Sequence, residues 1–423
     1  MGFRRSGRSA RSTVPRAGCA LLLALALAGC GTPPDERPST LPSPGPLAPP
    51  SFVPAPVPAF ATTLRPALET RLRELRAPGA VVLVDVPGQG TWLTGLGVGD
   101  LDTGARMRVD DHVRTASVTK TFTATVVLQL VDEGRVRLDD PVATYVADVP
   151  NGATITVRDL LSHRSGLYNT TDDPGLNATL DAQPGKVWND QELLAIAFSH
   201  PPVFAPGQAF QYTNTNYLLL GLIAEQAGGA PLRDLMAQRI FTPLAMRDTT
   251  LPARDDSSIP GPHQRGYIFG TNTEGIAAYT AALAGDAAAA QVTVAPGVAP
   301  TDATDWSPSY TYADGAAIST VRDLQVWARA LATGALLSPA TQAQRLQFSA
   351  DGNYGLGIER SFGGLIGHNG AIPGFQTFVG YQPTTGATVI VAANLLLAPN
   401  TYLGSGLPAD ELARIIAQQL LPT

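Results

Sequence analysis

Strand-like segments occur near both ends of this chain, whereas its middle is helical in pattern. Early on, regularly spaced leucines predict a helix over 62–76, and apolar runs predict a strand over 80–86 with a hairpin partner over 91–98. Later strand patterns cover 354–358, 365–368, 375–381 and 387–393, followed by a final helix near 410–420. Because strands from both termini need partners that bury their apolar faces, we expect one mostly antiparallel sheet built from the two ends, with an inserted helical lobe.

The middle of the chain carries helix patterns that end at glycines. Segment 118–133 ends at Gly134, segment 217–226 ends before Gly228 and Gly229, and a third helix is expected over 320–331. The predicted class is therefore α/β, with a sheet lobe over 61–116 and 311–423 and a helical lobe over 117–310. A cleft between the lobes is the default position for an active site. Residues 271–305, rich in Ala, Thr and Gly, carry no pattern that assigns an element.

The first 60 residues have the composition of an export signal and a tether. Five arginines precede an apolar run over 20–28 that ends in Gly29 and Cys30, and this run is too short to span a bilayer. The end of the run resembles a bacterial lipoprotein processing box, in which Cys30 becomes the lipid-bearing first residue. A plain signal peptide with an incidental cysteine is the alternative. We therefore expect a signal over 1–29, a proline-rich tether over 30–60, and an exported protein anchored by the lipid on Cys30, outside the cytoplasmic membrane or in the cell envelope.

Charge and cysteine content exclude several classes of function. The formal net charge is −6, and removing the arginine-rich signal makes the protein more acidic still, which is unfavourable for binding nucleic acid. The two cysteines, Cys19 and Cys30, leave no disulfide in the folded domain once the signal is gone. The five histidines show no close ligand pair, so neither a zinc site nor any other metal or cofactor is predicted.

Three short motifs, in a definite order, carry the chemistry. Ser117 and Lys120 form an S-x-x-K at the start of a helix pattern, where residues three apart share one face and the lysine can reach the hydroxyl. Tyr212 and Asn214 form a Y-x-N just before the second helix. The third motif, on a predicted strand, is Gly367-His368-Asn369-Gly370-Ala371. Each motif alone is a weak signal, because each residue has an ordinary structural role such as helix capping or packing.

Taken together, these motifs resemble the penicillin-recognising serine hydrolases. These include class C β-lactamases, related esterases and, most closely, the soluble D-alanyl-D-alanine carboxypeptidases with S-x-x-K, Y-x-N and H-x-G. The resemblance implies an αβα sandwich plus a helical domain and an acyl-enzyme on Ser117, with Lys120 or Tyr212 as the base. It further implies that Asn214 holds the substrate amide, and that His368 supplies a donor whose charge depends on pH. The oxyanion would bind between the backbone N–H groups of Ser117 and Ala371.

The chain departs from the carboxypeptidase pattern at three positions. Asn369 and Ala371 flank Gly370 where the carboxypeptidases carry hydroxyls, and Glu359 stands where they have an arginine that receives the substrate carboxylate. The sequence therefore favours an exported hydrolase of D-alanyl peptides, with esterase or β-lactamase activity as variants. A non-catalytic tethered sensor is the second hypothesis. The expected partner is a small peptide, ester or β-lactam, and the oligomeric state is left open.

Overall fold

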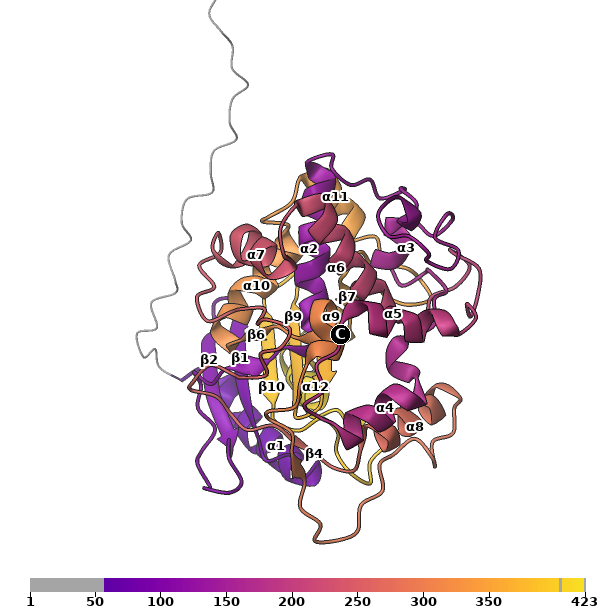
Figure 1. Ribbon diagram of the computed structural model, residues 1–423. Coiled ribbons are helices and arrows are strands. Elements are labelled where there is room, and N and C mark those ends of the chain that lie inside the picture. Colours follow the sequence, from indigo (N-terminus) through magenta and orange to yellow (C-terminus); the bar gives the residue numbers. More distant parts are fainter. Residues whose placement is uncertain (1–56, 403–404, 422–423) are drawn as a thin grey trace, which may run out of the picture. The chain divides into compact units, whose positions relative to one another are not determined.

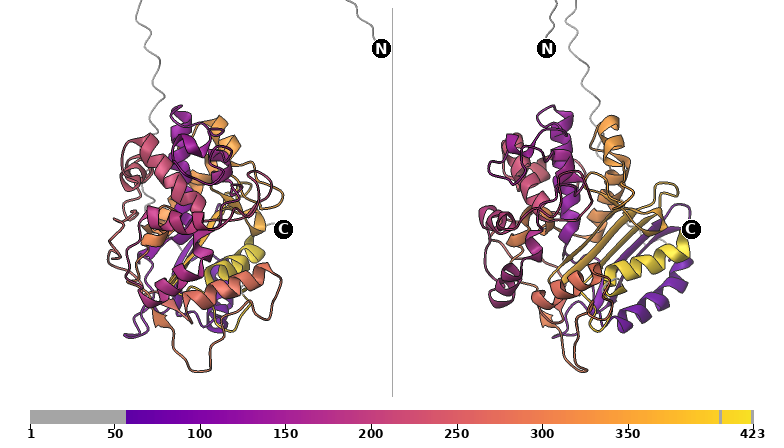
Figure 2. Two further views of the ribbon diagram at one scale, coloured as in Figure 1. Left: turned by 45° about the vertical axis from the view of Figure 1, so that its right-hand side comes forward. Right: turned by 90° about the vertical axis from the view of Figure 1, so that its right-hand side faces the viewer.

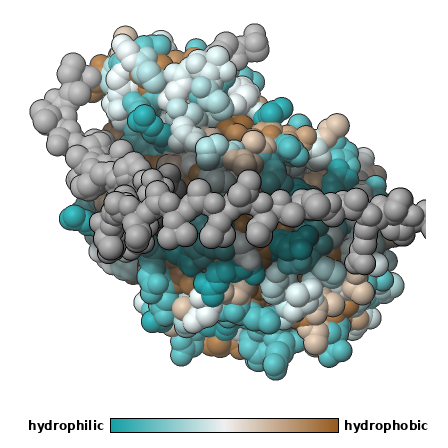
Figure 3. All heavy atoms as spheres, turned by 90° about the horizontal axis from the view of Figure 1, so that it is seen from above, coloured by the Kyte–Doolittle hydropathy of each residue, from teal (hydrophilic) through white to brown (hydrophobic). Residues whose placement is uncertain are grey.

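The computed structural model describes residues 57–402 and 405–421 (Figure 1). The predicted signal, nearly all of the tether and Cys30 lie outside these residues. Within the described part of the chain, no helix combines the length and the apolar character needed to cross a membrane. On the face in Figure 3, polar and apolar residues are intermixed wherever grey atoms do not cover them.

Both ends of the folded chain contribute strands to one antiparallel sheet. The order across the sheet is β2 (Gly90–Gly97), β1 (Gly79–Val86), β10 (Thr388–Ala393), β9 (Phe375–Tyr381), β8 (Ile366–Ile372) and β7 (Glu359–Arg360). The early strand β1 pairs directly with the late strand β10, with Val82 opposite Val391. The prediction of a sheet assembled from the two ends of the chain is confirmed.

Helices cover both faces of this sheet. Helices α1 (Phe60–Glu74) and α12 (Pro408–Leu420) pack on one face, where they appear side by side in the right-hand view of Figure 2. Helix α10 (Val321–Thr333) packs on the opposite face. Alternate residues of β1 therefore enter two different cores, Val81 on the α10 side and Val82 on the α1 side. Burial on both faces explains why β1 is a continuous apolar run rather than an alternating one.

A second group of helices packs beside the sheet, with α2 (Thr119–Asp132) and α6 (Thr215–Gly228) at its centre. Both are buried over most of their length, and α6 ends at Gly229 in the left-handed conformation, as its glycine pair predicts. The remaining helices and short strands are α3 (Val157–Leu161), α4 (Pro174–Ala182), α5 (Asp190–Ser199), α7 (Leu232–Met236), α8 (Asn272–Leu283), α9 (Tyr312–Gly315), α11 (Pro339–Arg345), β3 (Val113–Arg114), β4 (Tyr267–Ile268), β5 (Thr301–Asp302) and β6 (Ile318–Ser319).

The structure corrects one predicted strand and fills the unassigned segment. Residues 354–358 form a turn rather than a strand, because Gly357 has φ +69° and passes so close to α2 that a Cβ there would lie 2.1 Å from that of Ala124. The strand begins only afterwards, at β7. Within 271–305, helix α8 is capped by Thr271, whose side chain forms a capping box with Glu274.

Candidate active site

A tight turn presents Ser117 to the solvent at the front of α2. Residues Ala116–Val118 form a 3-10 turn that continues into α2, and Ala116 has φ +47°, a conformation that is rare for a residue with a side chain. The Lys120 ammonium lies one turn further on and donates to Ser117 Oγ at 3.1 Å. The predicted contact within the S-x-x-K motif is thus present. Strained backbone of this kind is often found where a functional group must be held in place.

Lys120 is completely buried and is paired with a carboxylate that the sequence reasoning missed. Its Nζ lies 3.2 Å from Asp314 Oδ2 and donates to the Asp314 backbone carbonyl at 3.0 Å. Burial lowers the pKa of Lys120, and the Asp314 carboxylate opposes that shift. Burial likewise raises the pKa of Asp314, with Lys120 acting in the opposite direction. Asp314 lies on α9, 194 residues from Lys120 in sequence, so no local motif links the two.

The Y-x-N motif lies on the other side of Lys120. Lys120 Nζ is 5.0 Å from the centroid of the Tyr212 ring. Burial raises the pKa of the Tyr212 phenol well above its ordinary value, while a hydrogen bond with the Ser117 hydroxyl lowers it. Asn214 is held by two contacts, since its backbone N–H donates to Asn169 Oδ1 and its Nδ2 to Thr171 Oγ1, both at 2.8 Å.

His163 is buried among aromatic rings behind this motif. Its ring centroid lies 4.3 Å from that of Tyr212, and its Nδ1 accepts a hydrogen bond from the backbone N–H of Thr213 at 3.2 Å. Burial and the nearby Lys120 charge lower the pKa of His163 well below its ordinary value. The neutral imidazole therefore fixes the backbone and ring position of the Y-x-N loop.

Strand β8 passes close to the nucleophile turn because Gly370 has no side chain. A Cβ on Gly370 would lie 2.7 Å from the Ser117 amide nitrogen and 2.4 Å from the Thr115 carbonyl oxygen. The next residue, Ala371, is exposed and lines the same cavity as Ser117. Gly370 thus brings the backbone of β8 beside the Ser117 amide, which is the arrangement that an oxyanion site between Ser117 and Ala371 requires.

His368 lies on β8 but is buried away from the cavity lining. Its Nε2 is 2.9 Å from the Tyr354 hydroxyl, and its ring centroid is 6.2 Å from that of Tyr212. Burial, assisted by the Lys120 charge, lowers the pKa of His368 to about 3. The imidazole is therefore neutral across the physiological range. This corrects the expectation from sequence that its charge varies with pH.

A carboxylate cluster surrounds Asn369 on the same strand. The backbone N–H of Asn369 donates to Glu359 Oε1 at 3.2 Å, and its Nδ2 donates to Asp410 Oδ2 at 2.8 Å. Burial raises the pKa of Glu359 to about 8, with a further rise from Asp410. Burial also raises the pKa of Asp410 to about 6. Glu359 was singled out from sequence, but its partner on α12 was not.

These residues open onto a cavity of about 410 Å³. Of the catalytic and substrate-binding residues predicted from sequence, all but Lys120 and His368 are in its lining, which includes Ser117, Tyr212, Asn214, Asn369, Gly370 and Ala371. Among the described residues that line the cavity there is no lysine, arginine or histidine, whereas Asp172, Asp314 and Glu359 are present. In the same described residues, no cluster of three or more histidine, cysteine or acidic side chains could hold a metal ion.

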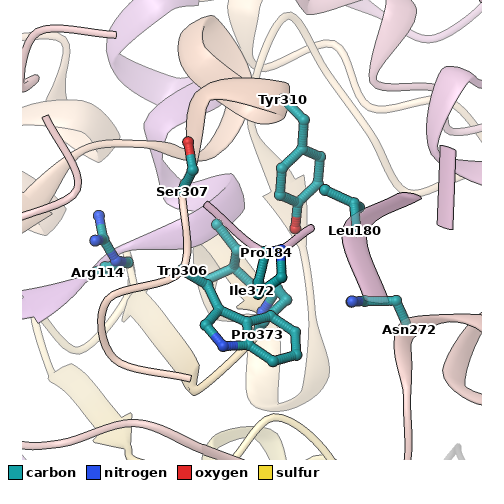
Figure 4. A pocket seen from close by; sticks show the side chains of 9 residues that line it. All are labelled: Arg114, Leu180, Pro184, Asn272, Trp306, Ser307, Tyr310, Ile372 and Pro373. Atoms are coloured by element: carbon teal, nitrogen blue, oxygen red, sulfur yellow. The ribbon is translucent and has the colours of Figure 1, made fainter. Parts of the chain in front are cut away.

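A second, much smaller pocket adjoins the cavity and shares five lining residues with it, namely Leu180, Asn272, Tyr310, Ile372 and Pro373. Figure 4 shows the Trp306 ring in its centre, with Arg114 on one side and Asn272 on the other. Its volume of about 10 Å³ is enough for roughly one water molecule. The larger cavity, which contains Ser117, is therefore the one with room for a substrate.

Comparison with known proteins gives a consistent match. The beta-lactamase family model matches residues 64–402. The chain is 32% identical over 209 residues to esterase EstB of Burkholderia gladioli, covering 46% of this chain and 52% of that protein. It is 35% identical over 157 residues to the D-alanyl-D-alanine-carboxypeptidase/endopeptidase AmpH of Escherichia coli K12, covering 36% of this chain and 40% of that protein. The chain thus spans about half the length of the curated relatives it matches.

A solved structure is similar over a larger part of the chain. It is a D-stereospecific amidohydrolase from Streptomyces sp., with 30% identity, a TM-score of 0.66, and coverage of 79% of this chain and 95% of that chain. The structural match therefore extends over most of this chain and nearly the whole of the amidohydrolase.

Proposed function

Because the chain belongs to the beta-lactamase family, whose members are serine hydrolases, we propose that it forms an acyl-enzyme on Ser117. The observation that carries the proposal is the contact of Lys120 Nζ with Ser117 Oγ at 3.1 Å beside a cavity of about 410 Å³. A serine hydroxyl is a weak nucleophile near neutral pH and needs an adjacent base. A non-catalytic sensor would have no need of this contact.

The pKa shifts in the site favour Lys120 over Tyr212 as the base. Burial lowers the pKa of Lys120, which makes the neutral amine accessible, but raises that of Tyr212, which disfavours the phenolate. Lys120 would take the Ser117 proton as Oγ attacks the carbonyl carbon. The Tyr212 hydroxyl would pass a proton to the leaving group, and the same steps in reverse with water would release the acid.

The substrate we favour is an amide, ester or internal peptide bond without a free carboxylate next to the reacting carbonyl. The described cavity lining contains no lysine, arginine or histidine that could bind a free carboxylate, and Glu359 stands where the carboxypeptidases have the arginine that does so. The similarity to a D-stereospecific amidohydrolase supports a D-configured acyl group. D-Alanyl-D-alanine carboxypeptidase activity is the second candidate, supported by the motifs and by the similarity to AmpH.

Covalent labelling and substrate comparison test the proposal. Incubation with a fluorescent penicillin or a short-chain p-nitrophenyl ester should add one acyl mass that maps to Ser117. Ser117→Ala should abolish the adduct, whereas Ser199→Ala, at an exposed serine whose hydroxyl bonds only to the Ile196 carbonyl among the described residues, should not. A D-amino-acid amide should be hydrolysed faster than a peptide ending in D-Ala-D-Ala. Absence of every adduct and every turnover would instead support the sensor.

We also propose that the protein is exported and anchored through a lipid on Cys30, on the strength of the sequence pattern alone. Radiolabelled palmitate should be incorporated into the protein in its own cells. Cys30→Ala should remove the label and release the protein from the membrane fraction. Membrane association that persists without label would contradict the lipid anchor.

A further inference from the structure

We propose that Asp314 is the third member of a Ser117–Lys120–Asp314 relay, in which it positions Lys120 and stabilises the ammonium formed when Lys120 takes the Ser117 proton. This inference rests on the proposed acyl-enzyme function and adds a positioning residue to it. The three groups are arranged in sequence, with 3.1 Å from Ser117 Oγ to Lys120 Nζ and 3.2 Å from Nζ to Asp314 Oδ2. A nucleophile, a base and a group that orients the base form the general pattern of an activated nucleophile.

The contacts of Asp314 suit this role. Its backbone carbonyl and its Oδ2 both accept from Lys120, so two of the lysine's hydrogen atoms are directed away from Ser117. The lone pair of a neutral Lys120 amine is then free to face the Ser117 hydroxyl. Asp314 Oδ1 is buried and has no hydrogen-bond partner among the described residues, so the contact of Oδ2 with Lys120 is the ion pair of this carboxylate there.

Within the described part of the chain, no other carboxylate is hydrogen-bonded to Lys120. The titratable groups that surround the pair from neighbouring elements are Tyr212, Tyr217, Tyr310, His163, His368, Asp190 and Glu359. Burial raises the pKa of each of these tyrosines and lowers that of each of these histidines, so all five are neutral near pH 7. Asp314 is therefore the carboxylate in direct contact with the lysine when the lysine becomes charged.

The step conserves protons and electrons. The Ser117 O–H bond breaks as Oγ bonds to the substrate carbonyl carbon, the proton moves to Lys120 Nζ, and the carbonyl oxygen becomes the oxyanion. Asp314 stays ionised throughout and lowers the energy of the new ammonium through their 3.2 Å contact. When the oxyanion collapses, the bond to the leaving group breaks and the proton of Lys120 goes to that group through Tyr212.

The chain offers a direct measurement, because Lys120 and Lys186 are its only lysines. Labelling with ¹³Cε-lysine should give two resonances, and Lys186, which contacts Glu192 and Trp188, serves as the internal reference. An opposite charge at this distance shifts a pKa by about 1–3 units. In Asp314→Asn the Lys120 resonance should therefore titrate about 1–3 units lower than in the wild type. This readout needs no activity, so it tests the pair even if acylation were to fail.

Kinetics provide the second readout. The acid limb of kcat/KM for ester hydrolysis should move to lower pH in Asp314→Asn by the same number of units, and the plateau should fall about 10²-fold. Asp314→Glu, which retains the charge, should recover part of both. Asp323→Asn is the matched control, because Asp323 is a buried carboxylate bonded to Thr249 Oγ1 and the Asp248 N–H instead of a lysine.

Two outcomes would overturn the relay. An unchanged Lys120 titration and acid limb in Asp314→Asn would show that the carboxylate has only a structural role. Loss of activity at the alkaline side, with the acid limb unmoved, would show that Lys120 acts as an ammonium and that another group is the base. If Asp314→Asn does not fold, the Lys120 titration and the pH dependence of kcat/KM can be measured in Asp314→Ser instead, because the serine hydroxyl can still accept a hydrogen bond from Lys120.

Discussion

The two walls of the cavity differ in how they carry charge. The wall formed by the nucleophile turn, α2 and α9 contains Lys120 and Asp314, a buried pair of opposite charges beside Ser117. The wall formed by β7 and β8 contains His368 with its pKa lowered to about 3 and Glu359 with its pKa raised to about 8. Both groups of the strand wall are therefore mainly uncharged near pH 7.

This difference suggests a division of labour. A charge can be formed and removed on the helix wall at low energetic cost because its partner is already in place. On the strand wall an isolated buried charge would have no such partner, so that wall contributes shape, neutral hydrogen bonds and the backbone of β8. We therefore assign removal of the Ser117 proton to the helix wall, and the neutral contacts that shape the substrate site to the strand wall.

The largest expected effect is the removal of the lysine from the helix wall. Lys120→Met should lower kcat/KM for acylation about 10³-fold, because a positioned general base contributes about 10²–10⁴-fold. It should also destabilise the protein by about 3–5 kcal/mol, since it leaves the Asp314 carboxylate buried without its ion-pair partner. Ester hydrolysis and urea unfolding measure the two effects.

The double variant Lys120→Met, Asp314→Asn separates these effects. It should remain inactive but recover most of the lost stability, because it removes both charges together. If the double variant were no more stable than Lys120→Met alone, the two side chains would not form a coupled ion pair. The contrast between the walls would then lose its basis.

A smaller loss of activity is expected when the close contact between β8 and the nucleophile turn is disturbed. Gly370→Ala places a Cβ 2.7 Å from the Ser117 amide nitrogen and should displace an oxyanion donor, with a loss of about 10²–10³ in turnover. Gly367→Ala is the matched variant on the same strand, where the Cβ would instead lie 2.0 Å from the Val379 carbonyl oxygen across the sheet. Gly367→Ala should therefore lower the melting temperature more than it lowers the rate per folded molecule. Equal rate losses in the two variants would contradict a specific contact at Ser117.

On the strand wall, Glu359→Gln should change stability more than chemistry. The folded-state pKa of Glu359 is raised to about 8, so its favourable contribution is complete below pH 4 to 5 and is lost as the pH rises through about 8. The wild type should lose about 3–4 kcal/mol more stability between pH 5 and 8 than Glu359→Gln does, at about 1.36 kcal/mol per pH unit. Urea unfolding across this range measures the difference. Parallel pH profiles would show that Glu359 is ionised at pH 7 and that the strand wall is charged.

The sequence predicts the helix wall better than the strand wall, for a physical reason. Ser117 and Lys120 are three residues apart in one helical turn, so their contact follows from local geometry. Asp314 reaches the same lysine across 194 residues, and Glu359 meets Asp410 only because both carboxylates contact Asn369 of β8. Pairs that are far apart in sequence leave no motif of fixed residue spacing from which they could be predicted.

The same reasoning applies to the elements of the fold. Apolar runs in β1 and β10 and the glycine after α6 predict those elements, because burial and backbone conformation are local requirements. The apolar residues of 354–358 satisfy the strand pattern and so predict a strand, whereas the close approach of Gly357 to Ala124 in the observed turn is a tertiary contact. Helix α8 was missed because alanine, threonine and glycine give no amphipathic periodicity.

The smallest expected effect concerns His368, and it tests the contrast most sharply. With a pKa of about 3, His368 should add no ionisation to the rate profile between pH 5 and 9. His368→Gln should lower the rate only about 3–10-fold, because a glutamine amide can retain one of the two hydrogen bonds of the imidazole, with Tyr354 and with the Asn369 carbonyl, and one lost bond is worth about 1 kcal/mol. The pH dependence of kcat/KM for ester hydrolysis should keep its shape. Disappearance in His368→Gln of a wild-type limb near pH 6 to 7 would show that the imidazole titrates during catalysis. In that case the strand wall would transfer protons too, and the division between the walls would be wrong.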